Sequence, residues 1–279
     1  MTDHSSEGSG EVPHDEPADR IRSDRPLSAR VWGYLLGSKA NFAADREVGD
    51  MILETFPDFA LLARLQRRFL ARAVRFLAGE AAIRQFLDIG SGLPTVDNTH
   101  EVAQRVAPES RIVYVDNDPL VQLHSQALLT STPEGKCDYI DGDVRAPEPL
   151  LEKAAETLDF DQPIALTMLG IMGQLPDSGD PWGITRRLLD ALPAGSYLAL
   201  SDGTNTNAAL NKAVETYNAS SANSYHLRPP DQIARFFDGL ELVAPGIVPT
   251  PIWQRDTPVP AEPPTSAHAL CGVARQISA

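Results

Sequence analysis

Residues 86–94 read FLDIGSGLP and constrain the fold of this chain more than any other stretch. The apolar run predicts a buried strand at 85–89 that carries an acid, Asp88, near its end. A tight turn through Gly90 and Gly92 follows. Ligands of open α/β sheets bind in the crevice beyond the carboxyl ends of the strands. The segment therefore predicts a ligand-binding loop at that edge of a parallel sheet.

Short apolar segments alternate with helical patterns from this strand onward. This alternation is typical of βαβ units, and continuous apolar runs such as 164–169 suit strands that are buried on both faces. We therefore predict an α/β fold with a doubly wound, mostly parallel sheet, and a loop in the proline-rich segment 245–264. Strands are predicted at 85–89, 111–115, 137–140, 163–169, 196–201, 240–243 and 267–275, and helices near 99–107, 118–130, 147–157, 182–191 and 207–218 and after 229–231.

Helical patterns also precede the first strand. Helices are predicted at 28–36, after Asn41 and at 58–78. Ser28 is expected to cap the first of them and Gly37 to end it. Five arginines of the third helix are interpreted as a solvated face beside its apolar stripe: Arg64, Arg67, Arg68, Arg72 and Arg75.

These patterns divide the chain into regions. The first residues contain almost no large apolar side chains, which is typical of a disordered tail. A helical cap follows, and then a sheet domain interrupted by a polar insertion. The expected boundaries are 1–25 for the tail, 26–80 for the cap, 81–279 for the sheet domain and 204–230 for the insertion.

The composition excludes several classes of protein. A net charge of −14 and a pI near 4.8 argue against a nucleic-acid-binding protein, which needs a basic patch. No apolar run approaches the roughly 20 residues that span a bilayer, and the polar, acidic amino terminus is no signal peptide. Cys137 and Cys271 form no metal-binding pattern and are expected to be free thiols. We therefore expect a cytoplasmic protein with no metal, membrane or nucleic-acid partner.

Acids occur at the ends of successive predicted strands, at Asp88, Asp116 and Asp143. An acid in the position of Asp116 can accept both hydroxyls of a ribose. Asp143, with the backbone of Val144, can bind the exocyclic amine of adenine, and Asp88 can hold the glycine loop or a ligand's ammonium group. The alternative is that these acids are ordinary helix caps. The predicted cofactor-binding residues are Asp88, Gly90, Ser91, Gly92, Asp116, Asn117, Asp143 and Val144.

The glycine loop distinguishes between two adenosine cofactors. A dinucleotide fingerprint has a third glycine, where this chain has Thr95, and places a helix close behind the loop to bind pyrophosphate. Asp97 would repel a phosphate group there. S-adenosylmethionine (SAM) has no phosphate and carries a cationic sulfonium, which suits acidic surroundings. The sequence therefore favours SAM, and an NAD-dependent oxidoreductase is the weaker alternative.

Long segments of the chain resemble the actinobacterial S-adenosyl methyltransferase family, which was long described as a domain of unknown function. The resemblance covers about 26–275 and implies a seven-stranded, Rossmann-like methyltransferase sheet with an amino-terminal helical cap and SAM as cofactor, but no particular substrate. The segments that carry it are SARVWGYLLG at 28–37, NFAADR at 41–46, FLDIGSGLP at 86–94, NTHEVAQ at 98–104 and VYVDNDP at 113–119, and later 158–163, 191–198, 236–243 and 245–246.

The chain departs from this family at two positions beside the expected acceptor pocket. Gly173 stands where the family has a histidine, and Ser201-Asp202 stand where the family reads Ser-His. We predict a SAM-dependent methyltransferase that acts on a small molecule. Since either histidine could serve as a base, the alternative is a SAM-binding sensor or partner protein without turnover.

No catalytic residue can be assigned from the sequence. Polar side chains in the cap could face the acceptor or fix the cap to the sheet, and a histidine in the insertion could act as a base or lie at the surface. The candidates on the acceptor side are Arg30, Tyr34, Asn41 and His226.

Overall fold

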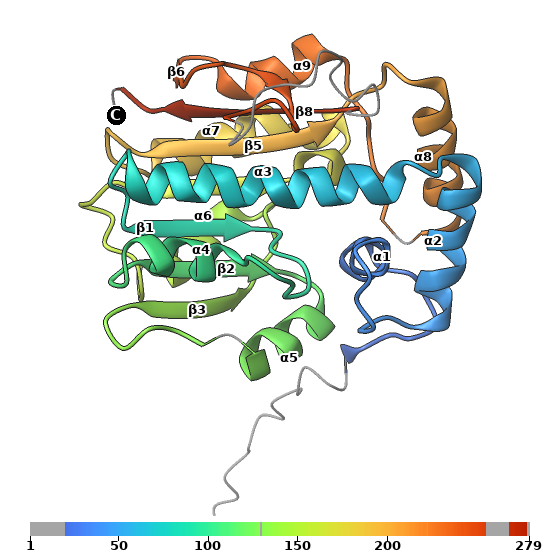
Figure 1. Cartoon of the computed structure of the whole chain (residues 1–279), viewed down its shortest axis with the longest axis horizontal. Helices are drawn as coiled ribbons and strands as arrows, with labels where there is room; N and C mark the ends of the chain where they lie inside the picture. Colours follow the sequence, from blue (N-terminus) through green and yellow to red (C-terminus); the bar gives the residue numbers. More distant parts are fainter. Residues whose placement is uncertain (1–19, 129, 222, 255–267, 278–279) are drawn as a thin grey trace, which may run out of the picture.

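The computed structural model describes residues 20–128, 130–221, 223–254 and 268–277. A central sheet has the strand order β3-β2-β1-β4-β5-β8-β6, with β7 paired to β8 (Figure 1). Strands β1 to β5 are parallel, and β8 is antiparallel to β5. The strands are β1 Gln85–Ile89, β2 Arg111–Asp116, β3 Lys136–Asp141, β4 Ala165–Leu169, β5 Tyr197–Gly203, β6 Glu241–Leu242, β7 Val248–Pro249 and β8 Ala269–Arg275.

The predicted α/β class with a doubly wound, mostly parallel sheet is confirmed. Within the described ranges the sheet has eight strands rather than seven. The additional strand is β7, two residues in the segment that we expected to be a loop, which pair with Cys271 and Leu270 of β8.

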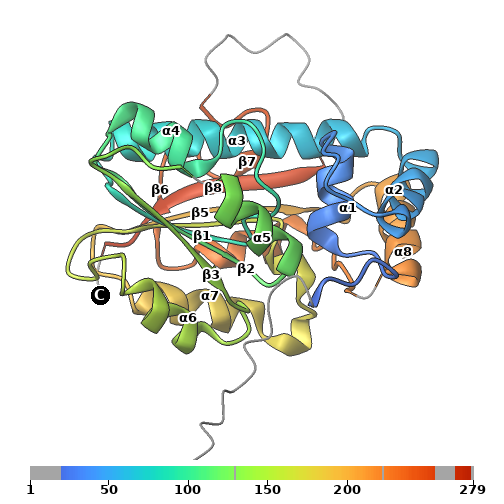
Figure 2. The same ribbon diagram turned by 90° about the horizontal axis from the view of Figure 1, so that it is seen from below.

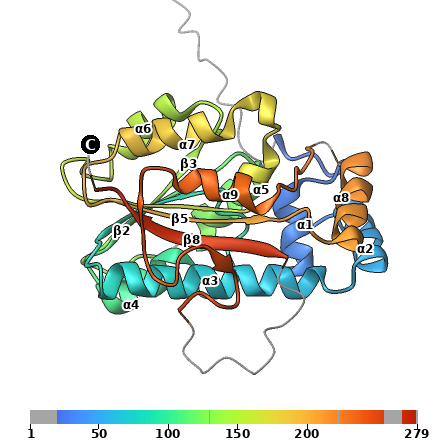
Figure 3. The same ribbon diagram turned by 90° about the horizontal axis from the view of Figure 1, so that it is seen from above.

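Helices cover both faces of the sheet (Figures 2 and 3). Alternate residues of a strand point to opposite faces. Phe86 of β1 accordingly packs in a cluster with Phe69 of α3, whereas Leu87 packs with Leu150 of α6 and Leu188 of α7. Both faces of β1 are therefore apolar and buried. The helices of these layers are α3 Phe59–Gly79 and α4 Thr99–Val106 on one face, and α6 Pro147–Ala154, α7 Pro181–Asp190 and α9 Pro230–Ala234 on the other.

A helical cap covers the carboxyl ends of the strands (Figure 1). It consists of α1 Ser28–Leu35, α2 Ala43–Thr55 and α8 Ala208–Ser220. Val31, Ile52 and Leu210, one from each helix, belong to a single buried apolar cluster. The start of α3, at Leu62 and Ala63, packs in the same cluster, whereas the rest of α3 lies along the sheet and α8, from the insertion, joins the cap.

The start of the cap differs from the sequence prediction. Leu27, not Ser28, is the N-cap residue of α1, and its side chain makes no capping hydrogen bond. The buried Asp45 carboxylate of α2 instead accepts the backbone N–H groups of Leu27, at 3.1 Å, and Phe42, at 2.8 Å. One carboxylate therefore holds the first turns of two helices. Gly37, with φ +91°, follows the C-cap of α1 as predicted.

The predicted tail is in part ordered. Residues 1–19 lie outside the described residues. Arg20 forms an ion pair with Asp141 at 2.6 Å, and the carbonyl of Arg22 accepts a hydrogen bond from Arg30. The ordered part of the chain therefore begins before residue 26, because these two arginines contact residues of the sheet and the cap. No helix in the described part of the chain is long and apolar enough to cross a bilayer.

Candidate functional site

A pocket lies between the carboxyl ends of the strands and the cap. Polar residues line it at the sheet, and mostly apolar residues line it at the cap. The sheet side includes Asp88, Gly90, Ser91, Gly92, Asp116, Asn117, Gly142, Asp143, Val144, Arg145, Gly170 and Ile171, and the cap side includes Val31, Trp32, Leu35, Leu36, Ile52, Phe59, Leu210, Val214, Tyr217, Tyr225 and Leu227. All eight residues predicted to bind the cofactor lie on the sheet side.

The glycine loop needs glycine for two different reasons. Gly90 and Gly92 have φ values of +72° and +66°, which L side chains rarely adopt. A Cβ at Gly90 would lie 1.8 Å from Cδ1 of Ile171, so this glycine allows close packing against the segment after β4. A Cβ at Gly92 would meet nothing within 4 Å, so the backbone there is open to a ligand.

Asp116 holds the glycine loop from the neighbouring strand. Its Oδ2 accepts the N–H of Gly92 at 2.8 Å, and its Oδ1 accepts the N–H of Asp118 at 3.1 Å. The side chain is buried, and burial raises its pKa to about 6. The sequence suggests Asp88 for this role, but the direct hydrogen bond to the loop comes from Asp116.

Asp88 is fixed between two hydroxyl groups. Its carboxylate accepts from Thr99 Oγ1 at 2.6 Å and from Thr167 Oγ1 at 2.7 Å. Burial raises its pKa, against the effect of these hydrogen bonds. Asp88 lies in the pocket wall, where it can meet an ammonium group.

Asp143 is more exposed than the other two acids and is paired with Arg145. It accepts the backbone N–H of Arg145 at 2.9 Å and also binds the guanidinium group. Burial raises the pKa of Asp143, but the hydrogen bonds from Arg145 outweigh burial, and the pKa is lowered. The carboxylate is thus partly occupied, whereas the neighbouring Val144 also lines the pocket.

Arg67 is a site residue that the sequence did not reveal. We interpreted it as part of a solvated helix face, but it is half-buried and lines the pocket beside Gln66 and Leu70. Its Nη2 makes long hydrogen bonds, of 3.3 to 3.4 Å, to oxygens of residues 96–98. Its Nε is buried and has no hydrogen-bond partner among the described residues, and burial lowers the pKa of Arg67. The available signal was Gln66, a polar residue in the apolar stripe of α3. Arg72 also departs from the prediction, since it donates to the carbonyls of Trp253 and Thr250.

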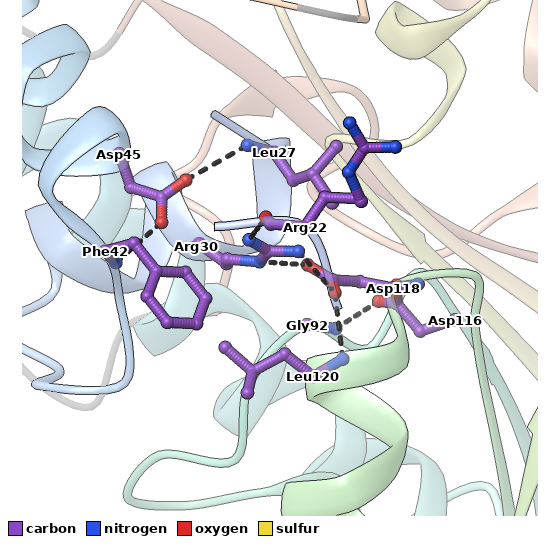
Figure 4. Close-up of polar contacts among 9 residues, drawn as sticks. All are labelled: Arg22, Leu27, Arg30, Phe42, Asp45, Gly92, Asp116, Asp118 and Leu120. Atoms are coloured by element: carbon purple, nitrogen blue, oxygen red, sulfur yellow. Dashed lines mark hydrogen bonds and ion pairs between the residues drawn. The ribbon is translucent and has the colours of Figure 1, made fainter. Parts of the chain in front are cut away.

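Arg30 holds the cap through the polar contacts drawn in Figure 4. It does not line the pocket formed by the described residues. It is fully buried and binds Asp118 through two hydrogen bonds, Nε to Oδ2 at 3.0 Å and Nη2 to Oδ1 at 3.2 Å. Its guanidinium also lies 5.1 Å from the centre of the Phe42 ring. Asp118 donates its N–H to Asp116, which holds Gly92. A continuous chain of polar contacts therefore joins the cap to the glycine loop.

The other three candidates on the acceptor side, like Arg30, do not line the pocket that the described residues form. Tyr34 donates to Asp50 at 2.6 Å. Asn41 donates to the carbonyl of Ser38 and accepts from Arg46. The backbone N–H of His226 donates to the carbonyl of Gly173. Tyr34 and Asn41 thus shape the cap rather than line the pocket formed by the described residues.

In the described ranges, no group of three His, Cys, Asp or Glu side chains could hold a metal ion.

Comparisons with known proteins agree on one family. A family model described as S-adenosyl methyltransferase matches residues 14–277. The chain is 43% identical to a DUF574 family protein from Streptomyces avermitilis MA-4680, with a TM-score of 0.87 over 91% of this chain and 98% of that one. It is 40% identical to a candidate methyltransferase from Thermobifida fusca YX, with a TM-score of 0.83 over 92% and 97% of the two chains. A search of curated proteins found no match.

Proposed function

Because the chain belongs to the S-adenosyl methyltransferase family, we propose that it binds SAM against the glycine loop and methylates a small molecule held under the cap. SAM supplies an electrophilic methyl group bonded to a sulfonium sulfur. A nucleophile attacks the methyl carbon in line with the C–S bond, and S-adenosylhomocysteine leaves. The main contribution of the protein is to align the reacting groups. A base is needed only where the nucleophile must lose a proton near the transition state.

The residues of the sheet side fit SAM. We assign Asp116 to the ribose hydroxyls, and Asp143 with the backbone of Val144 to adenine, since all three residues line the pocket. The observation that carries the proposal is a set of polar atoms around the open glycine loop. Arg67 Nε and Ser91 Oγ are buried and lack a partner among the described residues, and Asp88 lines the same pocket.

These groups match the amino-acid end of SAM, which carries an ammonium and a carboxylate. Asp88 is suited to the ammonium, and Arg67 to the carboxylate. An arginine is well adapted to this task because it presents several donors in a fixed geometry to a carboxylate.

Replacing Arg67 with methionine tests this assignment. We expect binding of S-adenosylhomocysteine, measured by calorimetry, to weaken by roughly 10- to 100-fold, because a charge-assisted hydrogen bond is lost. Binding of 5′-methylthioadenosine, which lacks the amino-acid end, should stay within about twofold. Arg68→Met, at the exposed neighbouring position, serves as the control. Equal losses for both ligands would refute the assignment of Arg67 to the carboxylate.

The cap side of the pocket supports a small acceptor with an apolar body. Trp32, Leu36 and Leu227 are among the side chains that form it. Apolar walls with few polar groups are typical of small-molecule sites. The net charge of −14 gives no support to a nucleic-acid substrate.

Turnover is tested by incubating the protein with SAM and a panel of small alcohols, phenols, amines and thiols. We expect S-adenosylhomocysteine to be released faster with at least one acceptor than with SAM alone, and mass spectrometry should find the acceptor heavier by one methyl group. Asp116→Ala should abolish the acceptor-dependent release. Tight SAM binding with no release across the whole panel would instead indicate a binding protein without turnover.

A further inference from the structure

The ring of Tyr225 occupies the space above Gly173. A Cβ at position 173 would lie 2.3 Å from Cζ of Tyr225, so only glycine leaves room for the ring. Gly173 follows β4, and the Tyr225 hydroxyl is within 3.4 Å of the N–H of Gly203 at the end of β5. Tyr225 therefore lies over the ends of the two central strands and forms part of the pocket wall.

The hydroxyl of Tyr225 has a defined direction. It donates to Oδ1 of Asp202, which also accepts the N–H of Gly203 at 3.0 Å. Asp202 is 2% exposed, and its Oδ2 makes no hydrogen bond with any described residue. Burial raises the pKa of Asp202 to about 6, against the hydrogen bond from Tyr225 and the charge of Arg228. At neutral pH the Asp202 carboxylate is thus ionised and accepts the hydrogen bond from the Tyr225 hydroxyl.

This arrangement leaves the Tyr225 oxygen as an acceptor beside the pocket. The N–H of Gly203 makes only a long contact with it, so a lone pair remains for a donor from the pocket. The same pocket wall has apolar members such as Leu227 and Val214 and few polar ones, Gln174 and Tyr217 among them. A ligand that fits both features has an apolar body and one hydroxyl group.

Resting on the function proposed above, we propose that Tyr225, held by Asp202, is the residue that binds the hydroxyl of a phenol or similar apolar alcohol as the methyl acceptor. When the acceptor oxygen takes the methyl group, its proton passes to the Tyr225 oxygen. The Tyr225 hydroxyl proton passes at the same time to Asp202. The carboxylate ends neutral and releases the proton to solvent, so Tyr225 is unchanged after each cycle.

The experiment measures binding of 2-naphthol and of 2-methylnaphthalene, which has a methyl group in place of the hydroxyl, with S-adenosylhomocysteine present. We expect the wild type to prefer 2-naphthol by about tenfold, the contribution of one hydrogen bond. Tyr225→Phe keeps the ring over Gly173 and should lose the preference. An equal preference in Tyr225→Phe, or none in the wild type, would overturn the proposal.

The pH dependence of this preference separates a binding role from a structural one. Tyr225 and Arg228 are the titratable and charged side chains that act on Asp202. Below pH 6 Asp202 becomes protonated and can donate its own hydrogen to the Tyr225 oxygen, which occupies the lone pair offered to the ligand. The preference should therefore fall between pH 7.5 and pH 5. Asp202→Asn still accepts from Tyr225 but cannot titrate, and should keep the preference across this range. A preference in the wild type that does not change with pH would contradict the role of Asp202.

S-adenosylhomocysteine binding by the same samples distinguishes this proposal from the proposed function. If S-adenosylhomocysteine binds but the hydroxyl preference is absent, only the role of Tyr225 fails. If S-adenosylhomocysteine does not bind the wild type, the cofactor site itself is refuted.

Discussion

Replacing Asp116 with alanine is expected to weaken S-adenosylhomocysteine binding by roughly 30- to 150-fold, which corresponds to about 2–3 kcal/mol. The carboxylate accepts the N–H groups of Gly92 and Asp118, and it is our proposed acceptor for the ribose hydroxyls. Its removal therefore frees the glycine loop and deletes a contact to the ligand. Isothermal titration calorimetry at neutral pH measures the loss directly.

Asp141→Ala is the matched control for this experiment. Asp141 stands at the same register on the neighbouring strand as Asp116, but its carboxylate pairs with Arg20 and does not line the pocket formed by the described residues. We expect this variant to bind S-adenosylhomocysteine within about twofold of the wild type. If Asp116→Ala is folded, as judged by circular dichroism, and binds with unchanged affinity, Asp116 is not a cofactor ligand.

Replacing Arg30 with methionine is expected to lower the free energy of unfolding by about 3–5 kcal/mol, the usual consequence of leaving one charge of a buried ion pair without its partner. Arg30 is fully buried, and Asp118 nearly so. The variant also loses the hydrogen bond to the Arg22 carbonyl and the contact with Phe42. Urea unfolding, followed by tryptophan fluorescence, measures the change.

Two controls identify the cause. Lys212→Met breaks an exposed pair with Glu215 on α8 and should cost less than about 0.5 kcal/mol. The double variant Arg30→Met, Asp118→Leu removes both buried charges and should recover part of the loss, although Asp118 also accepts the N–H of Leu120 at the start of α5 (Pro119–Leu128). A single Arg30→Met variant as stable as the wild type would contradict the structural role of this pair.

Local sequence patterns predict the structure correctly where residues close together in the chain determine it. The strand before Asp88, the glycine turn and the acid at the end of β2 lie within short segments whose order fixes their geometry. The eight residues that we predict to bind the cofactor accordingly all lie in the pocket wall on the sheet side. The same holds for Gly37, whose positive φ ends α1.

The remaining site residues depend on contacts between distant segments. The partner of Arg30, Asp118, comes from another part of the chain, so the sequence alone could not tell a pocket arginine from a buried structural one. Arg67 faces the pocket only because α3 lies along the sheet with that side toward the glycine loop. Gly173 and Asp202 stood out singly as departures from the family, but only the fold brings Tyr225 between them.

The composite origin of the cap has a consequence for how acceptor preference could change in evolution or by engineering. Two of its helices come from the amino-terminal segment and the third from the insertion after β5, and they share one apolar cluster. Exchanging either segment alone between relatives would place unmatched side chains in that cluster. The start of α3, at Leu62 and Ala63, belongs to the same cluster. A recombination that keeps this packing would therefore transfer residues 28–63 and 208–220 together, and stepwise divergence would favour paired substitutions in the two segments.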